Sequence, residues 1–308
     1  MNVPMIPPPL LSAGLGFSAD AFGRDGPTAA ELDEIIPDRS AILFDDGAHS
    51  AWVNTKTMQE AGITKNTPDP IPGSHFYKRD ANGNPTGWLL ESQTFNPVLK
   101  KLGLASPDSV KAGFEDIALL FSYMGITSVY DAGMNGFEKE AYAALKDLER
   151  QNNLPFRIVS SYIVQSPAQV PGALKELKYY HDNYSGKYVH PKVLKIHNDG
   201  TVEARTAALY EDYADDPGNK GATTLPYDTL EKLVIEGDQA GYDIHIHAIG
   251  DRTITEALDA IEKARQENGI GKNTHTICHD VMFKSWMIIA SNALGRCMFS
   301  HNPHQSGR

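Results

Sequence analysis

Cysteine is scarce in this sequence, since only Cys278 and Cys297 occur among 308 residues. Two cysteines are too few for the disulfide framework on which small secreted folds depend. Their scarcity favours a reducing compartment, so we expect a cytoplasmic protein. A chain of this length has room for a large hydrophobic core that needs no covalent support.

Long hydrophobic segments and basic clusters are also missing. The apolar stretch 1–17 carries four prolines and no basic region ahead of it, which argues against a signal peptide and against a membrane span. Lysine and arginine number 28 against 39 acidic residues, so the formal net charge is -11. This balance argues against electrostatic binding to nucleic acid or to an anionic membrane. We expect a small-molecule substrate, with no nucleic-acid partner and no membrane partner.

Short β-rich runs alternate with amphipathic segments of helical length from about residue 106 onward. The predicted strands are apolar or alternating and cover residues 126–130, 156–164, 193–197, 243–249, 274–279 and 297–300. The predicted helices place apolar residues three and four apart and cover residues 110–124, 138–150, 173–180, 229–240, 253–267 and 284–294. Six successive β/α units predict an α/β fold, either a closed eight-stranded barrel or an open doubly wound sheet.

The first 105 residues differ in character. A strand-like run at 41–44 precedes a polar segment that is rich in proline, glycine and asparagine and shows little periodicity. We expect residues 1–105 to form an N-terminal segment and an irregular inserted lobe that borders the pocket. Residues 106–308 are expected to hold the β/α units.

One predicted strand places an amine on an unexpected face. Alternation puts Lys195 and His197 on the face opposite Ile196. If helices cover the isoleucine side, Lys195 points into the barrel, where an ammonium group is costly unless it is paired or modified. A surface lysine on an edge strand, or one paired with a carboxylate, fits the pattern equally well.

The next two predicted strands end near histidines. His245 and His247 share one face, and His247 lies nearer the carboxyl end, where α/β barrels place their active groups. His245 is expected to be a core histidine or to contact a ligand residue. In the following unit, alternation groups His275 with His279, although His275 lies too deep to share a metal with it. Cys278 is expected on the other face, as a small buried hydrophobe.

Lys195, His247 and His279 therefore lie at or near the ends of three consecutive predicted strands, which a barrel would bring together. Two imidazoles and an anionic oxygen form a hydrolytic zinc environment with room for a water molecule. A lysine becomes such an oxygen donor once carbon dioxide carboxylates its amine, which also removes the buried cation. We expect a divalent metal, with zinc as the first expectation.

Seven segments occur in order between about residues 25 and 303. They are Asp46-Gly-Ala-His-Ser-Ala-Trp-Val-Asn54, Gly62-Ile-Thr with Thr67-Pro-Asp-Pro, Gly83-Asn-Pro-Thr-Gly87, Gly125-Ile-Thr-Ser-Val, Leu194-Lys-Ile-His-Asn-Asp-Gly200, His247-Ala-Ile-Gly-Asp251 and the strand ending in His279. These segments resemble the amidohydrolase superfamily, in the branch of metal-dependent hydrolases that includes N-substituted formamide deformylases.

The resemblance implies a distorted (β/α)8 barrel that hydrolyses C–N bonds of amide or formamide type with a metal-activated water. Lys195 corresponds to a carboxylated lysine that bridges two divalent metals, and His247 and His279 correspond to ligands of the second metal. These three residues are therefore the predicted catalytic and metal-binding residues. His49, in the excursion beside the pocket, and Asp199, in the segment that follows Lys195, are predicted substrate contacts.

Two parts of the family pattern are not found. No His-x-His pair of the kind carried by the family's first strand precedes His245. The sequence stops at Arg308, just after the expected seventh strand, and so before the strand whose aspartate shuttles the proton. We therefore expect a barrel that is incomplete at both ends, with at most one metal, weak metal binding and little or no hydrolysis. Its open edges would favour self-association, which allows for a homo-oligomer.

Two other functions fit the same residues. A Schiff-base lyase would use Lys195 as an amine nucleophile and would be trapped by borohydride with a keto substrate. A degenerate or truncated barrel would bind a ligand without turnover and would hold no metal. The substrate itself depends on pocket loops, which the resemblance does not determine.

Overall fold

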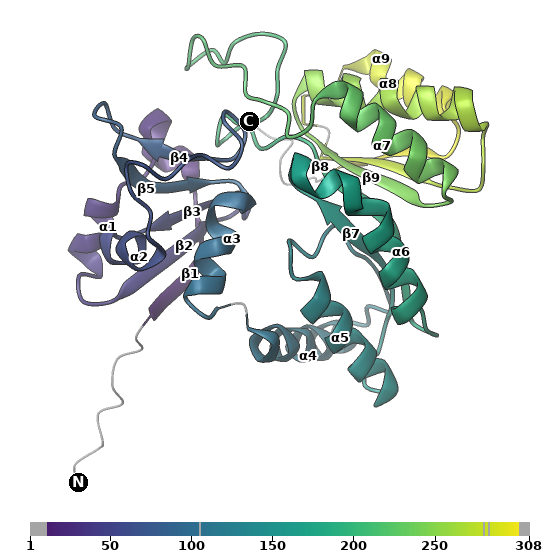
Figure 1. Cartoon of the computed structure of the whole chain (residues 1–308), viewed down its shortest axis with the longest axis horizontal. Coiled ribbons are helices and arrows are strands. Elements are labelled where there is room, and N and C mark those ends of the chain that lie inside the picture. The colour runs from purple at the N-terminus through teal and green to yellow at the C-terminus, as the bar shows by residue number, and fades with distance from the viewer. Residues whose placement is uncertain (1–10, 105, 280, 283, 302–308) are drawn as a thin grey trace. The chain divides into compact units, whose positions relative to one another are not determined.

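The computed structural model describes residues 11–104, 106–279, 281–282 and 284–301 (Figure 1). Residues 1–10, which belong to the apolar stretch considered above, lie outside this range. The chain divides into two units, Met1–Leu102 and Gly103–Arg308. Each unit has its own sheet and its own buried hydrophobic cluster.

The N-terminal unit contains a five-stranded sheet with the order β1-β2-β3-β5-β4. Its strands are β1 (Leu11–Phe17), β2 (Ser40–Asp45), β3 (Ser50–Val53), β4 (Phe76–Arg79) and β5 (Pro85–Leu90). Its helices are the 3-10 helix η1 (Ala19–Asp25), α1 (Ala29–Ile35), α2 (Thr55–Ala61) and α3 (Ser92–Lys101). β1 pairs with β2 in parallel, whereas the other neighbours are antiparallel. Leu32, Ala41 and Trp52 pack together in its core.

The prediction of an irregular lobe was wrong for this unit. The polar segment rich in proline, glycine and asparagine contains β4 and β5, which form an antiparallel hairpin. Asp80 Oδ1 accepts the backbone N–H groups of Asn82 and Asn84 at 2.9 and 2.8 Å, so these polar residues build the hairpin turn. Because β4 and β5 have only four and six residues, their alternation is too short to stand out in the sequence.

The C-terminal unit contains six parallel strands in the order β11-β10-β9-β8-β7-β6. They are β6 (Ser128–Tyr130), β7 (Arg157–Val164), β8 (Val189–His197), β9 (Asp243–Ala248), β10 (His275–His279) and β11 (Cys297–His301). Each strand lies beside its predecessor in the chain, as in a barrel, whereas a doubly wound sheet reverses its order at a switch point. The sheet is a curled half-barrel (Figure 1), and the described residues of this unit do not close it into a ring of eight.

Helices connect the parallel strands, as the alternation of β-rich and amphipathic segments predicts. They are α4 (Pro107–Tyr123), α5 (Glu138–Arg150), the 3-10 helix η2 (Pro167–Gly172), α6 (Ala173–Tyr184), α7 (Tyr227–Gln239), α8 (Asp251–Asn268) and α9 (Ser285–Ala293). α4 begins where Ser106 Oγ accepts the N–H group of Ser109 at 3.1 Å, with Pro107 in the first turn. The predicted helices agree with these bounds within a few residues.

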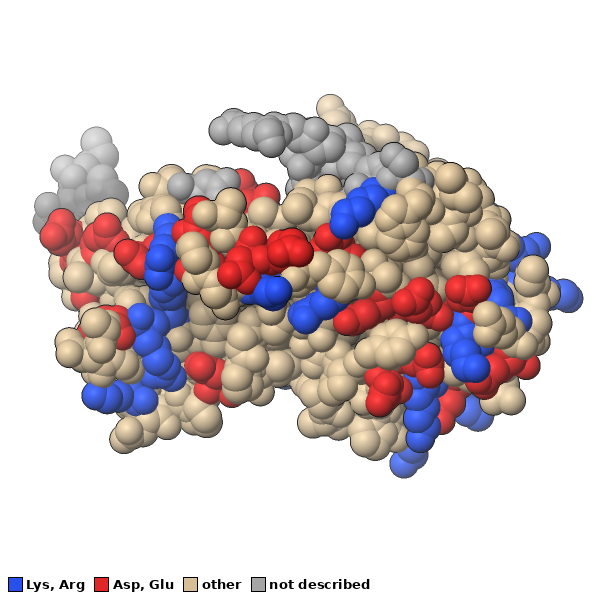
Figure 2. All heavy atoms as spheres, turned by 90° about the horizontal axis from the view of Figure 1, so that it is seen from above, with Lys and Arg blue, Asp and Glu red and all other residues tan. Residues whose placement is uncertain are grey.

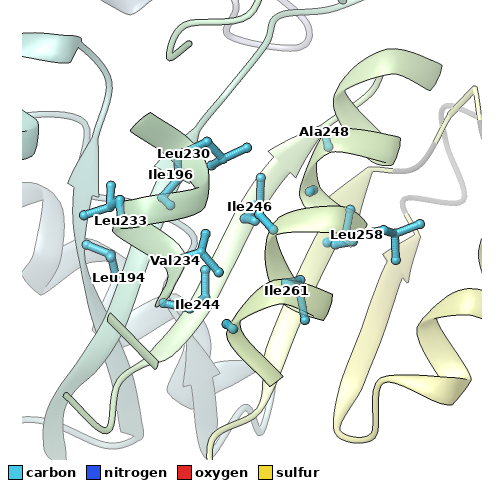
Figure 3. Close-up of a cluster of buried hydrophobic side chains, with 14 of the residues drawn as sticks. Leu194, Ile196, Leu230, Leu233, Val234, Ile244, Ile246, Ala248, Leu258 and Ile261 are labelled. Carbon is cyan, nitrogen blue, oxygen red and sulfur yellow. The ribbon is translucent and has the colours of Figure 1, made fainter. Parts of the chain in front are cut away.

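One face of the parallel sheet is covered by α7 and α8 (Figure 3). Leu194 and Ile196 of β8, with Ile244 and Ile246 of β9, are completely buried on this face. They pack against helix side chains that include Leu230, Leu233, Val234, Leu258 and Ile261. Burial of each such side chain contributes roughly 1.5–3 kcal/mol. Because strand side chains alternate, this packing sends the intervening lysine and histidines to the opposite, inner face.

The surface carries charges of both signs and some exposed apolar side chains. Acidic and basic side chains are interspersed on the face drawn in Figure 2. α4 exposes Leu119, Leu120 and Tyr123, and Met124 directly after it is exposed too. Exposed apolar surface of this kind favours association. The homo-oligomer stays a prediction. Among the described residues, no helix combines the length and the apolar character that crossing a membrane requires.

Candidate functional site

The register of β8, β9 and β10 places the chemically active side chains of the inner face side by side, in rows that run across the strands. In the parallel sheet, Lys195 of β8 lies beside His245 of β9, and His197 lies beside His247. His247 lies in turn beside Cys278 of β10. Residues that are direct neighbours across parallel strands point to the same face of the sheet. The inner face therefore carries an amine, three imidazoles and a thiol within two rows.

Lys195 is buried, with 3% of its surface exposed. Its Nζ donates a hydrogen bond to Cys278 Sγ at 3.1 Å. Within the described part of the chain, no carboxylate pairs with this amine. The interpretations of Lys195 as a surface lysine or a carboxylate-paired lysine therefore do not match its surroundings, whereas the inward orientation does.

His247 and His279 lie side by side, with ring centroids 4.5 Å apart. His247 is buried, and its Nε2 donates to the carbonyl oxygen of Gly200 at 3.3 Å. Asp199 Oδ1 lies 3.7 Å from the same nitrogen. A donating Nε2 fixes the tautomer in which Nδ1 carries the lone pair.

The backbone of His279 is unusual, because its φ is +82°. Positive φ is costly for a residue with a Cβ atom and interrupts the regular alternation of a strand. The prediction that His279 shares a face with His275 and Ile277 was therefore wrong. Ile277 packs in the core beneath the helices, whereas His279 approaches His247 of the inner face.

Cys278 is buried, as the sequence predicts, but it is more than a small hydrophobe. Its Sγ and one ring nitrogen each of His247 and His279 all lie within 4.8 Å of one another. The thiol also donates to the carbonyl oxygen of Ile246 at 3.3 Å. Cys278 therefore faces the same cluster as the two histidines.

His197 is a residue of the site that the sequence analysis did not select. Its ring centroid lies 4.5 Å from that of His247. The sequence did contain a signal for it. His197 lies two residues after Lys195 in the same predicted strand, and this spacing places both side chains on one face.

His245 is the most isolated imidazole of the inner face. Only 4% of its surface is exposed, and among the described residues neither ring nitrogen has a hydrogen-bond partner. Burial, followed by the charges of Lys195 and His279, lowers the pKa of His245 to about 2. The ring of Tyr130 lies 5.3 Å from it. His245 is therefore a buried, neutral imidazole whose two ring nitrogens make no hydrogen bond to the described residues.

Asp199 lies in the loop that follows β8 and is completely buried. Its Oδ1 accepts the N–H group of Ile249 at 3.0 Å, and its Oδ2 accepts those of Gly250 and Ala208 at 2.9 and 3.0 Å. Burial raises the pKa of Asp199 to about 7, against the opposing effect of these donors. The carboxylate thus ties the end of β9 to two loops. Its contact with a substrate stays a prediction.

His49 belongs to the N-terminal unit. Its Nδ1 donates to Glu91 Oε2 at 2.8 Å, and its backbone N–H group donates to Asp45 Oδ1 at 2.8 Å. These bonds fix the orientation of the ring. Its role as a substrate contact also stays a prediction.

His275, the deeper histidine of β10, makes hydrogen bonds that serve the fold. His275 Nε2 donates to Asp238 Oδ1 at 2.9 Å, and the N–H group of Ile244 donates to His275 Nδ1 at 3.2 Å. Arg265 Nη1 donates to the same Asp238 oxygen at 2.9 Å. Both ring nitrogens of His275 are therefore engaged away from the inner face.

The donor set of the inner face fits a divalent metal ion. Imidazole nitrogen and thiolate sulfur are ligands that zinc takes in proteins, and a carboxylated lysine would add oxygen. The cluster of His247, Cys278 and His279 has its donor atoms close enough to converge on one ion. The neighbouring His245 adds a buried polar side chain whose nitrogens lack partners among the described residues.

Comparison with known sequences gives consistent matches over most of the chain. A model of the Amidohydrolase family matches residues 9–285. The putative amidohydrolase YtcJ of Bacillus subtilis (strain 168) is 32% identical over 273 residues, which are 83% of this chain and 47% of that protein. The exoenzymes regulatory protein AepA of Pectobacterium carotovorum subsp. carotovorum is 29% identical over 272 residues, 88% of this chain and 56% of that protein.

A third relative is the N-substituted formamide deformylase of Arthrobacter pascens. It is 23% identical over 295 residues, which cover 85% of this chain and 48% of that protein. The chain thus spans about half the length of the curated relatives it matches.

Solved structures show the same fold. An uncharacterized metal-dependent hydrolase from Pyrococcus horikoshii OT3 aligns with a TM-score of 0.64 and 22% identity, over 96% of this chain and 55% of that one. Its counterpart from Pyrococcus furiosus aligns with a TM-score of 0.61 and 23% identity, over 96% and 56%.

Proposed function

Since this chain belongs to the amidohydrolase family, we propose that it is a metal-dependent hydrolase of small molecules that acts on C–N bonds of amide or formamide type. The observation that carries the proposal is the convergence of β8, β9 and β10 on one cluster. Lys195 Nζ contacts Cys278 Sγ, which in turn lies within 4.8 Å of ligand nitrogens of His247 and His279.

Lys195, His247 and His279 are the proposed holders of a divalent cation, with zinc as the first choice. Lys195 would act after carboxylation. Its amine loses a proton and attacks carbon dioxide, a C–N bond forms, and loss of a second proton leaves a carbamate whose oxygens can bind the cation. This replaces a costly buried ammonium by a ligand. When bound, such a cation lowers the pKa of a water molecule and polarises the substrate carbonyl.

The remaining residues position these groups. The carbonyl of Gly200 orients the His247 ring through Nε2, as partners of metal-binding histidines commonly do. Asp199 holds the loops around His247 through three backbone N–H groups. Because both of its oxygens are engaged in this way, Asp199 is poorly available as a general base, and we expect slow hydrolysis by this chain itself. His49 and Asp199 stay the proposed substrate contacts.

The test combines metal analysis with a hydrolysis assay. The purified chain is loaded with zinc in bicarbonate buffer, and formate release from an N-alkyl formamide is measured beside acetate release from the matching acetamide. We expect His247→Gln to lose zinc and the slow formate release together. His190→Gln is the matched control, because His190 lies exposed on β8 and should change neither quantity. Wild-type zinc content and formate release no higher than those of His247→Gln would overturn the proposal.

A further inference from the structure

We propose that Cys278 supplies a sulfur ligand to the cation that His247 and His279 hold, and that this centre therefore selects thiophilic divalent ions such as zinc or cadmium. The inference rests on the proposed metal binding by the two histidines. It does not depend on whether Lys195 is carboxylated or on which bond the protein hydrolyses.

The donor atoms of the three side chains converge. Cys278 Sγ and one nitrogen each of His247 and His279 lie within 4.8 Å of one another, which makes a set of three zinc-binding atoms. Two of the three residues are consecutive in β10. Consecutive residues of a regular strand point to opposite faces, so they cannot normally serve one ion.

The backbone conformation of His279 allows both consecutive side chains to reach the same cluster. The φ of +82° at His279 turns the chain at the end of β10, and the His279 ring lies beside His247 while Cys278 keeps its place in the row. A positive φ at a residue with a Cβ atom is strained and persists mainly where function requires it. Here its effect is to bring sulfur and imidazole from neighbouring residues to the same cluster.

The contacts of the sulfur fix its position on the inner face. Lys195 Nζ lies 3.1 Å from Cys278 Sγ and donates a hydrogen bond to it. When a cation binds, the S–H proton passes to solvent and the hydrogen bond to the Ile246 carbonyl is replaced by the metal–sulfur bond. Any group that forms on Nζ, a carbamate included, would also lie against this sulfur.

His245 provides an independent sign that the inner face holds something more than side chains. It is 4% exposed, and within the described residues both of its ring nitrogens lack partners. An unsatisfied buried polar group is destabilising, and a ligand, a bound ion or its water molecules would offset that cost. His245 lies beside Lys195 in the sheet, so this unsatisfied ring belongs to the same part of the inner face as the sulfur.

The experiment uses the full chain, stripped of metal and titrated with cobalt(II) and then with cadmium. We expect one equivalent of either ion to produce a sulfur-to-metal charge-transfer band in the ultraviolet. Cys278→Ser should remove the band and weaken zinc binding by more than about 100-fold, which exceeds the usual effect of losing a residue that only contacts a ligand. Cys297→Ser is the matched control, because Cys297 is the other buried cysteine and belongs to β11. It should keep both the band and the affinity.

The outcomes separate this inference from the proposed function. If the wild type binds one equivalent of metal without a charge-transfer band, sulfur ligation is wrong and the histidine site stands. If the wild type binds no metal, the metal-dependent function fails, and the sulfur ligand fails with it. The wild-type spectrum by itself decides between these cases, so a Cys278→Ser protein that does not fold leaves the inference testable.

Discussion

Lys195 Nζ lies 3.1 Å from Cys278 Sγ, although 83 residues separate the two in the chain. The amine belongs to β8 and the sulfur to β10, with β9 and its two histidines between them. The hydrogen bond therefore spans the three strands that carry the proposed metal-binding residues. It also gives a buried amine a partner where the described residues offer no carboxylate.

Replacing Lys195 with methionine should stabilise the metal-free protein and weaken zinc binding. A buried ammonium costs desolvation energy, so an apolar side chain of similar length should raise the free energy of unfolding by roughly 1–4 kcal/mol. Urea unfolding in EDTA measures the first effect, and competition with a zinc indicator measures the second. Lys192→Met is the control, because Lys192 is partly exposed and pairs with Asp243 at 3.0 Å. A destabilised Lys195→Met protein would contradict the argument from burial.

The positive φ at His279 predicts that glycine is more stable than alanine at this position, the reverse of the usual order in a strand. Glycine tolerates a φ of +82° and alanine does not, so His279→Gly should be more stable than His279→Ala by about 1 kcal/mol. At Thr276, in the middle of the same strand, the alanine variant should be the more stable. Chemical denaturation of the four proteins gives both differences. Equal stability of the two His279 variants would show that positive φ is not a property of this residue in solution.

The environment of His275 predicts a loss of stability in mild acid. Burial, followed by the charge of Arg265, lowers the pKa of His275 to about 4, against the opposing effect of Asp238. The N–H group of Ile244 points at Nδ1, so a second ring proton would break this bond. The unfolded chain takes up the proton near pH 6.5 and the folded chain does not. The stabilising contribution is therefore complete above about pH 6.5 and is lost as the pH falls from there toward 4.

A fall in the pKa of His275 from its usual value near 6.5 to about 4 corresponds to an effect on the order of 3 kcal/mol. Urea unfolding between pH 7 and 4 should show a smaller loss for His275→Gln than for the wild type. The variant still loses some stability, because burial also lowers the pKa of His75 in the N-terminal unit to about 4. His190→Gln, at an exposed position, should follow the wild type. Parallel pH profiles for wild type and His275→Gln would refute the assignment.

A methyl group at Gly250 should not be tolerated. A Cβ atom there would lie 1.9 Å from the carbonyl oxygen of Ala208 and 2.5 Å from its carbonyl carbon. The clash is with backbone atoms and lies next to the hydrogen bond that the Gly250 N–H group donates to Asp199 Oδ2. Gly250→Ala should therefore destabilise the protein by several kcal/mol, in the range of overpacked cores or more. Gly113→Ala is the opposite case. Gly113 lies within α4, has open space around it, and should gain about 0.5–1 kcal/mol as alanine. Thermal unfolding compares the two variants.

Much of the C-terminal unit follows from local pattern. The six predicted strands and six predicted helices correspond to β6 to β11 and α4 to α9, because long amphipathic segments and buried strands have strong periodicity. In the N-terminal unit, the strand-like run at 41–44 corresponds to β2. The sheet around it was missed, because β3, β4 and β5 have only four to six residues and show little periodicity. Strand order was also beyond local pattern, since it depends on which strands pair across the sheet.

The sequence by itself determined the alternation that buries Leu194 and Ile196 under helices and turns Lys195 inward, because side-chain direction in a strand has a period of two. Only the tertiary structure decided which side chains surround Lys195. The register of three strands placed Cys278 beside His247, and a positive φ overrode the period at His279. Neither can be read from local sequence, because pairing register and backbone strain are set by the packing of distant segments.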